Sequence, residues 1–153
     1  RLFVAAGDGT FTEGAVAAGV ADRERGYAAV CADFDNDGDV DIFQAHRNAQ
    51  SAATFWRNDG TGNEYLRVRL VGSAPNTQAA GARIRATVDN KEMLREIIIG
   101  SNYTSQNPTV QIFGLGEASN VDTLVVEWPD GLATTRTNVP AGQTLVIEQP
   151  SGG

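Results

Sequence analysis

Two segments of the chain alternate strictly between apolar and other residues, and this period of two constrains the fold more than any other feature. Residues 65–71 place Leu66, Val68 and Leu70 on one face and arginines on the other, and residues 82–88 follow the same pattern. Such alternation is typical of β-strands with one buried and one solvent-exposed face. Shorter strand candidates span residues 28–34, 40–44, 54–57, 94–99, 110–113, 123–127 and 144–148.

Turn-forming residues separate these strand candidates. Asp89-Asn90, Gly100-Ser101-Asn102, Pro129-Asp130-Gly131 and Pro140-Ala141-Gly142 are the clearest of these breaks, and each combines residue types that favour tight turns. Short strands separated by regular turns predict an all-β chain, with a small antiparallel β-sandwich or barrel-like domain in the C-terminal part. No run approaches the ~20 apolar residues of a transmembrane helix, so no membrane span is expected.

The net charge of −7 is concentrated in one place, because five of the 19 acidic residues lie between positions 33 and 41. Clustered Lys and Arg are needed for phosphate contacts, so this acidic chain is not expected to bind nucleic acid. A single Cys and a single His exclude zinc sites built from several cysteines and metal sites rich in histidine. The acidic cluster is therefore the main indication of function.

The segment 33–41 reads DFDNDGDVD and is typical of a loop that wraps its oxygen atoms around one Ca²⁺ ion. Carboxylates at positions 1, 3, 5 and 9 are hard ligands that favour calcium, and the glycine at position 6 permits a sharp turn. The alternative is a solvated acidic turn, in which unit charges ~4 Å apart repel by about 1 kcal/mol per pair in water. The predicted side-chain ligands are Asp33, Asp35, Asp37 and Asp41, and Asp39 is predicted to bind through its main-chain carbonyl.

An EF-hand is excluded by two features of the same region. Its twelfth position requires a bidentate Glu, whereas Gln44 stands there. Its loop joins two helices, whereas residues 28–34 and 40–44 are predicted strands. The sequence therefore predicts a calcium loop between two strands.

Several segments resemble known families. GDGTF (7–11), ADFDNDGDVDI (32–42) and WRNDGTG (56–62) resemble one FG-GAP/VCBS repeat. Residues 64–149 resemble the ASPIC/UnbV domain through YLRVRLVG (65–72), AGARI (80–84), GSNYTSQ (100–106), FGLG (113–116) and VVEWPDG (125–131). The resemblance implies a domain at 1–63 with one propeller-type blade and a calcium loop, then a β domain at 64–149. Residues 150–153 are expected to form a flexible tail.

These families also suggest where such a chain works and what it does. In cartilage acidic protein-like proteins such domains are secreted, so the resemblance implies a secreted or cell-surface location. It implies calcium-stabilised adhesion, scaffolding or self-assembly without catalysis, with a protein or glycan partner at the cell surface or in the matrix. The alternatives are a calcium-dependent carbohydrate-binding module and an accessory metal-dependent enzyme domain. A propeller needs four to eight blades, so we expect either the C-terminal end of a longer propeller or a homo-oligomer formed by strand pairing.

Other chemically notable residues are given structural roles. Cys31 lies in an apolar run and is expected to be a buried thiol, because free cysteines are commonly buried. His46 has no nucleophile motif beside it and is expected at the surface or at a sheet edge. Asn102 begins an N-glycosylation sequon, whose significance depends on the source. Three aromatic residues are considered as a sugar platform, with core or edge packing favoured for both tryptophans: Trp56, Tyr103 and Trp128.

Overall fold

The computed structural model describes residues 1–47, 52–60 and 62–152, so residue 61 of the repeat-like segment and residue 153 of the expected tail lie outside it. All the regular secondary structure in these ranges is β-strand, which confirms the all-β prediction. No helix that would be long and apolar enough to cross a membrane occurs among them. The strands are β1 (Phe3–Ala5), β2 (Phe11–Glu13), β3 (Gly26–Ala32), β4 (Asp41–His46), β5 (Thr54–Trp56), β6 (Glu64–Val71), β7 (Arg83–Val88), β8 (Lys91–Glu96), β9 (Gln111–Gly116), β10 (Asn120–Glu127), β11 (Ala133–Pro140) and β12 (Gln143–Glu148).

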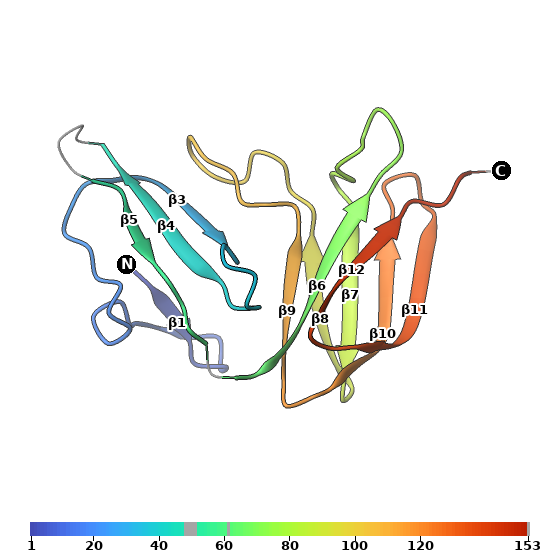
Figure 1. Ribbon diagram of the computed structural model, residues 1–153, viewed down its shortest axis with the longest axis horizontal. Helices are drawn as coiled ribbons and strands as arrows, with labels where there is room; N and C mark the ends of the chain where they lie inside the picture. The colour runs from blue at the N-terminus through green and yellow to red at the C-terminus, as the bar shows by residue number, and fades with distance from the viewer. Residues whose placement is uncertain (48–51, 61, 153) are drawn as a thin grey trace.

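Strands β6 to β12 form a sandwich of two sheets. One sheet has the order β12-β6-β9 and the other β11-β10-β7-β8. Neighbouring strands are antiparallel except β6 and β12, which run parallel with Leu66 opposite Gln143 and Val71 opposite Glu148. Figure 1 shows this sandwich on the right, with the N-terminal sheets on the left and the β8–β9 connection reaching between them.

The apolar face of each alternating strand points into one core shared by both sheets. Leu66 and Val68 of β6, together with Phe113 of β9, are fully buried against Ile84 of β7 and Leu124 of β10. The polar residues between them stay on the outer faces, as the period of two requires. The sandwich therefore buries its apolar side chains in its own core, and its outer faces remain available for contacts.

Residues 1–56 form two small sheets, β1-β2 and β3-β4-β5. The described residues do not form the single four-stranded blade that the resemblance implies, because β1 and β2 pair only with each other. Among the described residues of this part, Ala15, Ala32, Gly38 and Asp41 are buried, whereas Phe3 and Phe11 are 58% and 65% exposed. The described residues of these two sheets therefore enclose no hydrophobic core of their own.

Some strand predictions differ from the structure in their bounds. The strand predicted at 94–99 is β8, which ends at Glu96 because Ile97 turns inward and is buried in the core. Strand β11 is exposed along most of its length, with only Val139 buried. Its Thr-rich sequence carries no apolar alternation that would reveal it. Strand β1 was also not predicted, since it has only three residues and all are exposed.

Candidate metal centre

The aspartate loop joins the adjacent antiparallel strands β3 and β4, as predicted. Strand β3 ends at Ala32 and β4 begins at Asp41, and these two residues are opposite each other in the ladder. Between them, Asn36 and Gly38 take positive φ angles of 65° and 100°. Asn and Gly are the residues that adopt this conformation most readily, so the sequence allows the chain to fold back tightly here.

Three of the five predicted ligands converge in this loop. Asp33, Asp35 and Asp37 each offer a carboxylate oxygen within 4.8 Å of the other two. Asp33 is almost enclosed, with a side chain 3% exposed, whereas Asp35 and Asp37 are exposed. The group thus has one buried and two accessible carboxylates, which suits a cation entering from solvent.

Asp33 has one carboxylate oxygen satisfied and one unsatisfied. Its Oδ2 accepts hydrogen bonds from the Gly38 backbone N–H at 3.1 Å and from Arg67 Nη1 at 2.8 Å. Its Oδ1 is buried and accepts no hydrogen bond from the residues that the structure describes. Leaving a buried acceptor unsatisfied costs about 1–3 kcal/mol, and more when the group is charged. A bound cation would supply the missing partner, so the residues present fit a metal ion.

Asp41 plays a different part from the other aspartates. It is fully buried, and its two oxygens accept backbone N–H groups from Phe34 at 2.9 Å and Asn58 at 2.8 Å. These bonds tie the start of the loop to the segment after β5. The converging group does not include Asp41, so its direct coordination of an ion stays a prediction.

Asp39 packs against the turn that follows β5. Its backbone N–H donates to Asp37 Oδ1 at 3.0 Å. A Cβ added at Gly60 would collide with the Asp39 carboxylate unless the Asp39 side chain moved. Nothing in the structure tests the predicted main-chain coordination by Asp39.

The pKa values of two aspartates in the loop are raised by partial burial and by the negative charges around them. Partial desolvation, followed by the neighbouring Asp37 charge, raises the pKa of Asp35. Desolvation and the charges of Asp37, Asp33 and Asp41 likewise raise the pKa of Asp39. In both cases desolvation is the larger cause and neighbouring negative charge the second, and a bound cation would favour the charged carboxylates against both.

Strand β6 of the sandwich holds the loop from the other side. Arg67 Nη1 donates both to Asp33 Oδ2 and, at 2.7 Å, to Asn36 Oδ1. The Tyr65 ring lies so close to Gly38 that a Cβ at position 38 would overlap it. The sequence placed Tyr65 and Arg67 on the outward face of an alternating strand, but it gave no signal of what that face contacts.

A second contact joins the β8–β9 connection to the edge of β3 that does not face β4. Asn102 Nδ2 and Ser105 Oγ donate to the Ala29 carbonyl at 3.1 and 3.2 Å. Asn107 Oδ1 accepts from the Cys31 backbone N–H and from Asn102 Nδ2, both at 3.0 Å. These side chains occupy backbone groups that an added strand would otherwise use. The sequon nitrogen of Asn102 is therefore engaged within the fold.

The structure decides between the roles considered for three residues that the sequence singled out. Cys31 is exposed and lines an open cavity, so the prediction of a buried thiol is wrong. Trp128 is 3% exposed in the sandwich core and donates to Thr134 Oγ1 at 2.9 Å, which confirms core packing. Because Trp128 is buried, it does not form a surface platform with Tyr103, which is 76% exposed.

His46 is also not where the sequence suggested. Its side chain is 2% exposed and β4 is the middle strand of its sheet, so the prediction of a surface or sheet-edge position is wrong. Nδ1 lies 2.7 Å from the Ala52 carbonyl oxygen and Nε2 lies 2.8 Å from Asp22 Oδ2. A carbonyl and a carboxylate both accept hydrogen bonds, so the doubly protonated imidazolium satisfies both. The bond to Asp22, followed by the bond to Ala52, raises the pKa of His46.

This pair predicts a specific pH dependence of stability. Because the pKa of His46 is raised, His46 stabilises the folded state fully below its unfolded-state pKa of about 6.5. This stabilisation is lost as the pH rises through the pKa of the folded state. The pKa of Asp22 is lowered, first by the Glu24 backbone N–H and then by His46. Its contribution is therefore lost only as pH falls through that lowered value.

We expect the melting temperature of the wild type to fall between pH 6 and pH 8, and the corresponding fall in His46→Gln to be smaller. His46 is the only histidine in the chain, so no other imidazole contributes in this range. Thermal melts at half-unit pH intervals measure the effect, and Asp22→Asn serves as the partner variant. An identical pH profile for wild type and His46→Gln would contradict the proposed ion pair.

Comparison with known proteins identifies the C-terminal part. A model described as ASPIC and UnbV matches residues 72–153. Cartilage acidic protein 1 of Homo sapiens is 38% identical over 128 residues, which cover 78% of this chain and 18% of that protein. The Mus musculus protein of the same name is 36% identical over 133 residues, covering 81% and 19%. The Xenopus tropicalis protein is 35% identical over 120 residues, covering 74% and 18%.

The chain spans less than a fifth of the length of the curated relatives that it matches. The family match begins directly after β6 and takes in β7 to β12. The structure places β6 in the same sandwich, so the folded unit begins before the matched residues. Because the matched region covers more than half of the chain, the protein belongs to the ASPIC and UnbV family.

Proposed function

We propose that this chain is a calcium-stabilised module of an extracellular protein that serves adhesion, scaffolding or self-assembly and not catalysis. The observation that carries the calcium part is the buried Asp33 Oδ1, which has no hydrogen-bond partner in the described part of the chain, while Asp33 belongs to a group of three converging carboxylates. An unsatisfied, negatively charged oxygen in such a group calls for a cation.

Calcium is the ion that the donor set favours. The side-chain donors Asp33, Asp35 and Asp37 are all carboxylates, and hard oxygen ligands without nitrogen or sulfur disfavour zinc and copper. Mg²⁺ requires a smaller octahedral shell and retains its waters, which suits a flexible multi-carboxylate loop less well. Asp39 through its carbonyl and Asp41 complete the proposed set, with Asp41 also holding the loop closed through its two backbone contacts.

Two observations support an extracellular assembly role. The relatives are called cartilage acidic protein 1, a name that suggests a matrix location. The sheets of residues 1–56 leave apolar side chains uncovered, including Phe3, Phe11 and Phe55 at 58, 65 and 48% exposure. Such exposure is typical of a surface that packs against further protein. We propose that this part is an FG-GAP/VCBS-type repeat whose apolar faces contact neighbouring repeats.

The environment of His46 supports a non-catalytic role. A metal-dependent hydrolase needs a convergent general base close to its ion. Both ring nitrogens of His46 are engaged, one by Asp22 and one by Ala52. The only histidine is thus committed to holding residues 22, 46 and 52 together.

Isothermal titration calorimetry with CaCl₂ and, separately, MgCl₂ tests the metal proposal. We expect one Ca²⁺ per chain with a dissociation constant of about 10⁻⁴–10⁻³ M, as in extracellular modules, and weaker Mg²⁺ binding. Asp35→Asn removes an exposed ligand and is expected to weaken calcium binding at least about tenfold. Asp89→Asn in the β7–β8 turn is the matched control, because Asp89 is exposed and has a positive φ that Asn tolerates. No heat of binding with the wild type, or equal loss in both variants, would contradict a calcium site in this loop.

A further inference from the structure

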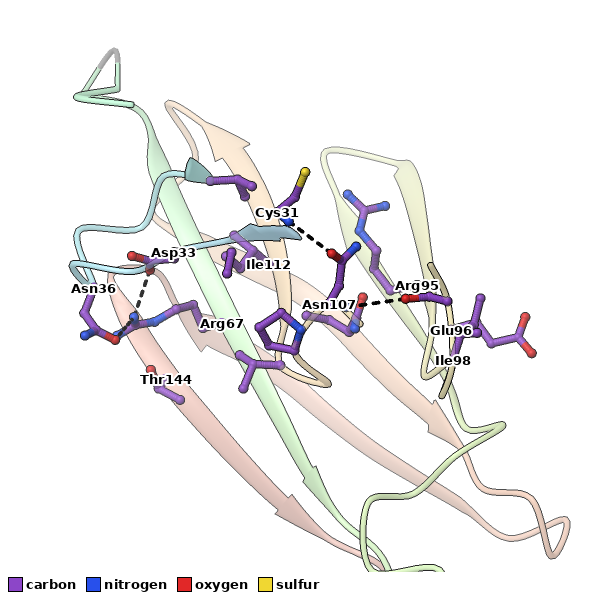
Figure 2. Close-up of a pocket in the computed structure, with 16 residues that line it drawn as sticks. Cys31, Asp33, Asn36, Arg67, Arg95, Glu96, Ile98, Asn107, Ile112 and Thr144 are labelled. Atoms are coloured by element: carbon purple, nitrogen blue, oxygen red, sulfur yellow. Dashed lines mark hydrogen bonds and ion pairs between the residues drawn. The ribbon is translucent and has the colours of Figure 1, made fainter. Parts of the chain in front are cut away.

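An open cavity of about 520 Å³ lies between the N-terminal sheets and the sandwich. Its volume falls in the range of about 300–1,000 Å³ that is usual for ligand sites. Figure 2 shows Asp33 and Asn36 of the aspartate loop at one end of this space and Arg95 and Ile98 at the other, with Asn107 between them. Both domain contacts described above border this space.

Apolar side chains form much of the cavity wall. Ile98 is 55% exposed although it follows directly on the buried Ile97. When a ligand removes such an exposed apolar side chain from water, the free energy of the complex falls. The apolar part of the wall consists of Val40, Ile98, Pro108, Val110 and Ile112.

The charged groups of the wall are not equally compensated. Arg67 is paired with Asp33 at 2.8 Å, and Glu96 has Arg83 at 3.9 Å. Arg95 donates from Nη1 to the backbone carbonyl of Leu94 at 3.0 Å. Within the described part of the chain, no carboxylate forms an ion pair with Arg95. Arg95 is therefore the uncompensated cation of this cavity.

A contact with the Phe113 ring positions Arg95, and the side-chain amide of Asn107 supplies a hydrogen-bond donor in the same cavity. The guanidinium carbon of Arg95 lies 5.3 Å from the centroid of the Phe113 ring, a cation–π contact that restricts its motion. Asn107 uses Oδ1 in two hydrogen bonds, whereas its Nδ2 donates to no described residue. Figure 2 shows Arg95 on the opposite side of the cavity from Asp33 and Asn36, so an anion bound there avoids the aspartate loop.

We propose that this cavity binds a peptide segment of a partner protein that carries a carboxylate side chain next to an apolar one. The carboxylate accepts hydrogen bonds from the Arg95 guanidinium and from Asn107 Nδ2. The neighbouring apolar side chain packs on Ile98, Pro108 and Val110. A guanidinium already positioned by an aromatic ring loses less freedom on binding a carboxylate, and its planar donors match the two carboxylate oxygens. A polyanion is a poor fit, because its remaining charges would approach the five aspartates.

Two peptides that differ only in charge test this proposal: acetyl-Val-Glu-Leu-amide and acetyl-Val-Gln-Leu-amide. The full chain, labelled with ¹⁵N and saturated with Ca²⁺, is titrated with each peptide and followed by NMR. We expect the Glu peptide to shift the Asn107 side-chain amide and the backbone signals of Arg95 and Ile98. We also expect it to bind about tenfold more tightly than the Gln peptide, the ratio that corresponds to one charge-assisted contact.

Arg95→Gln is expected to abolish the preference for the Glu peptide. The matched control is Arg136→Gln, because Arg136 is exposed and likewise donates from Nη1 to the preceding carbonyl, that of Thr135, at 3.1 Å. A dispersed spectrum shows that each variant is folded. Equal binding of both peptides, no shifts around the cavity, or a preference that survives in Arg95→Gln would overturn the proposal. Calorimetric calcium binding is measured on the same samples, so failure of the peptide site is distinguishable from failure of the metal site.

Discussion

Calcium at 100 times its dissociation constant is expected to raise the melting temperature of this chain by roughly 5–11 °C over the chelated form. An ion that binds only the folded state stabilises it by about 2.7 kcal/mol at that concentration. Each kcal/mol moves the midpoint by roughly 2–4 °C in a chain of this size. In this structure the stabilisation would arise from the orphan Asp33 Oδ1 and from the repulsion between Asp35, Asp37 and Asp39. Thermal melts in about 10–100 mM CaCl₂, which is 100 times the expected dissociation constant, and in excess chelator measure it.

Two variants separate metal binding from the hydrogen bonds that the loop also makes. Asp35 is exposed, and its charge adds to the repulsion in the loop. Asp35→Asn should therefore reduce the calcium shift and leave the melting temperature in chelator unchanged or slightly higher. Asp33 also accepts from Arg67 and Gly38, so Asp33→Asn should lower the melting temperature in chelator as well. A wild-type midpoint that is the same with calcium and with chelator would contradict a structural calcium ion.

The sequence predicted those features that depend on local chemistry. The alternation of residues 65–71 and 82–88 correctly placed β6 and β7, because a half-buried strand must present one apolar face. The spacing of the aspartates correctly placed the loop between two strands and brought Asp33, Asp35 and Asp37 together. In both cases residues close in sequence determine the outcome.

The sequence did not reveal features that depend on distant partners. Periodicity placed Arg67 on an outward face, but only the fold brings it to Asp33, 34 positions away. Asp41 is one of the predicted ligands, but its spacing gives no indication that its two oxygens accept hydrogen bonds from the backbone of Phe34 and Asn58. Cys31 lies in an apolar run that suggested burial, but it is exposed and lines an open cavity. Such outcomes require knowledge of what packs on each face.

The contact between Gly38 and Tyr65 predicts that Gly38→Ala is among the most destabilising single substitutions in the loop. Gly38 has a φ of 100°, and a side chain in the left-handed region costs roughly 1–2 kcal/mol. The added methyl group would also overlap the Tyr65 ring, and overpacking of this kind costs typically about 1–3 kcal/mol. We therefore expect a loss of about 2–5 kcal/mol, measured by urea unfolding in chelator.

Gly62→Ala isolates the conformational part of this loss, because Gly62 has a φ of 75° and open space around its missing Cβ. It should cost only roughly 1–2 kcal/mol. The steric part is tested in a double-mutant cycle with Tyr65→Ala, since residues in contact have non-additive effects. If the ring of β6 confines the loop, Gly38→Ala is less costly when Tyr65 is already alanine. An equal cost in both backgrounds would show that the sandwich does not press on the metal loop at Gly38, and that the two parts are coupled through Arg67 and the β3 edge instead.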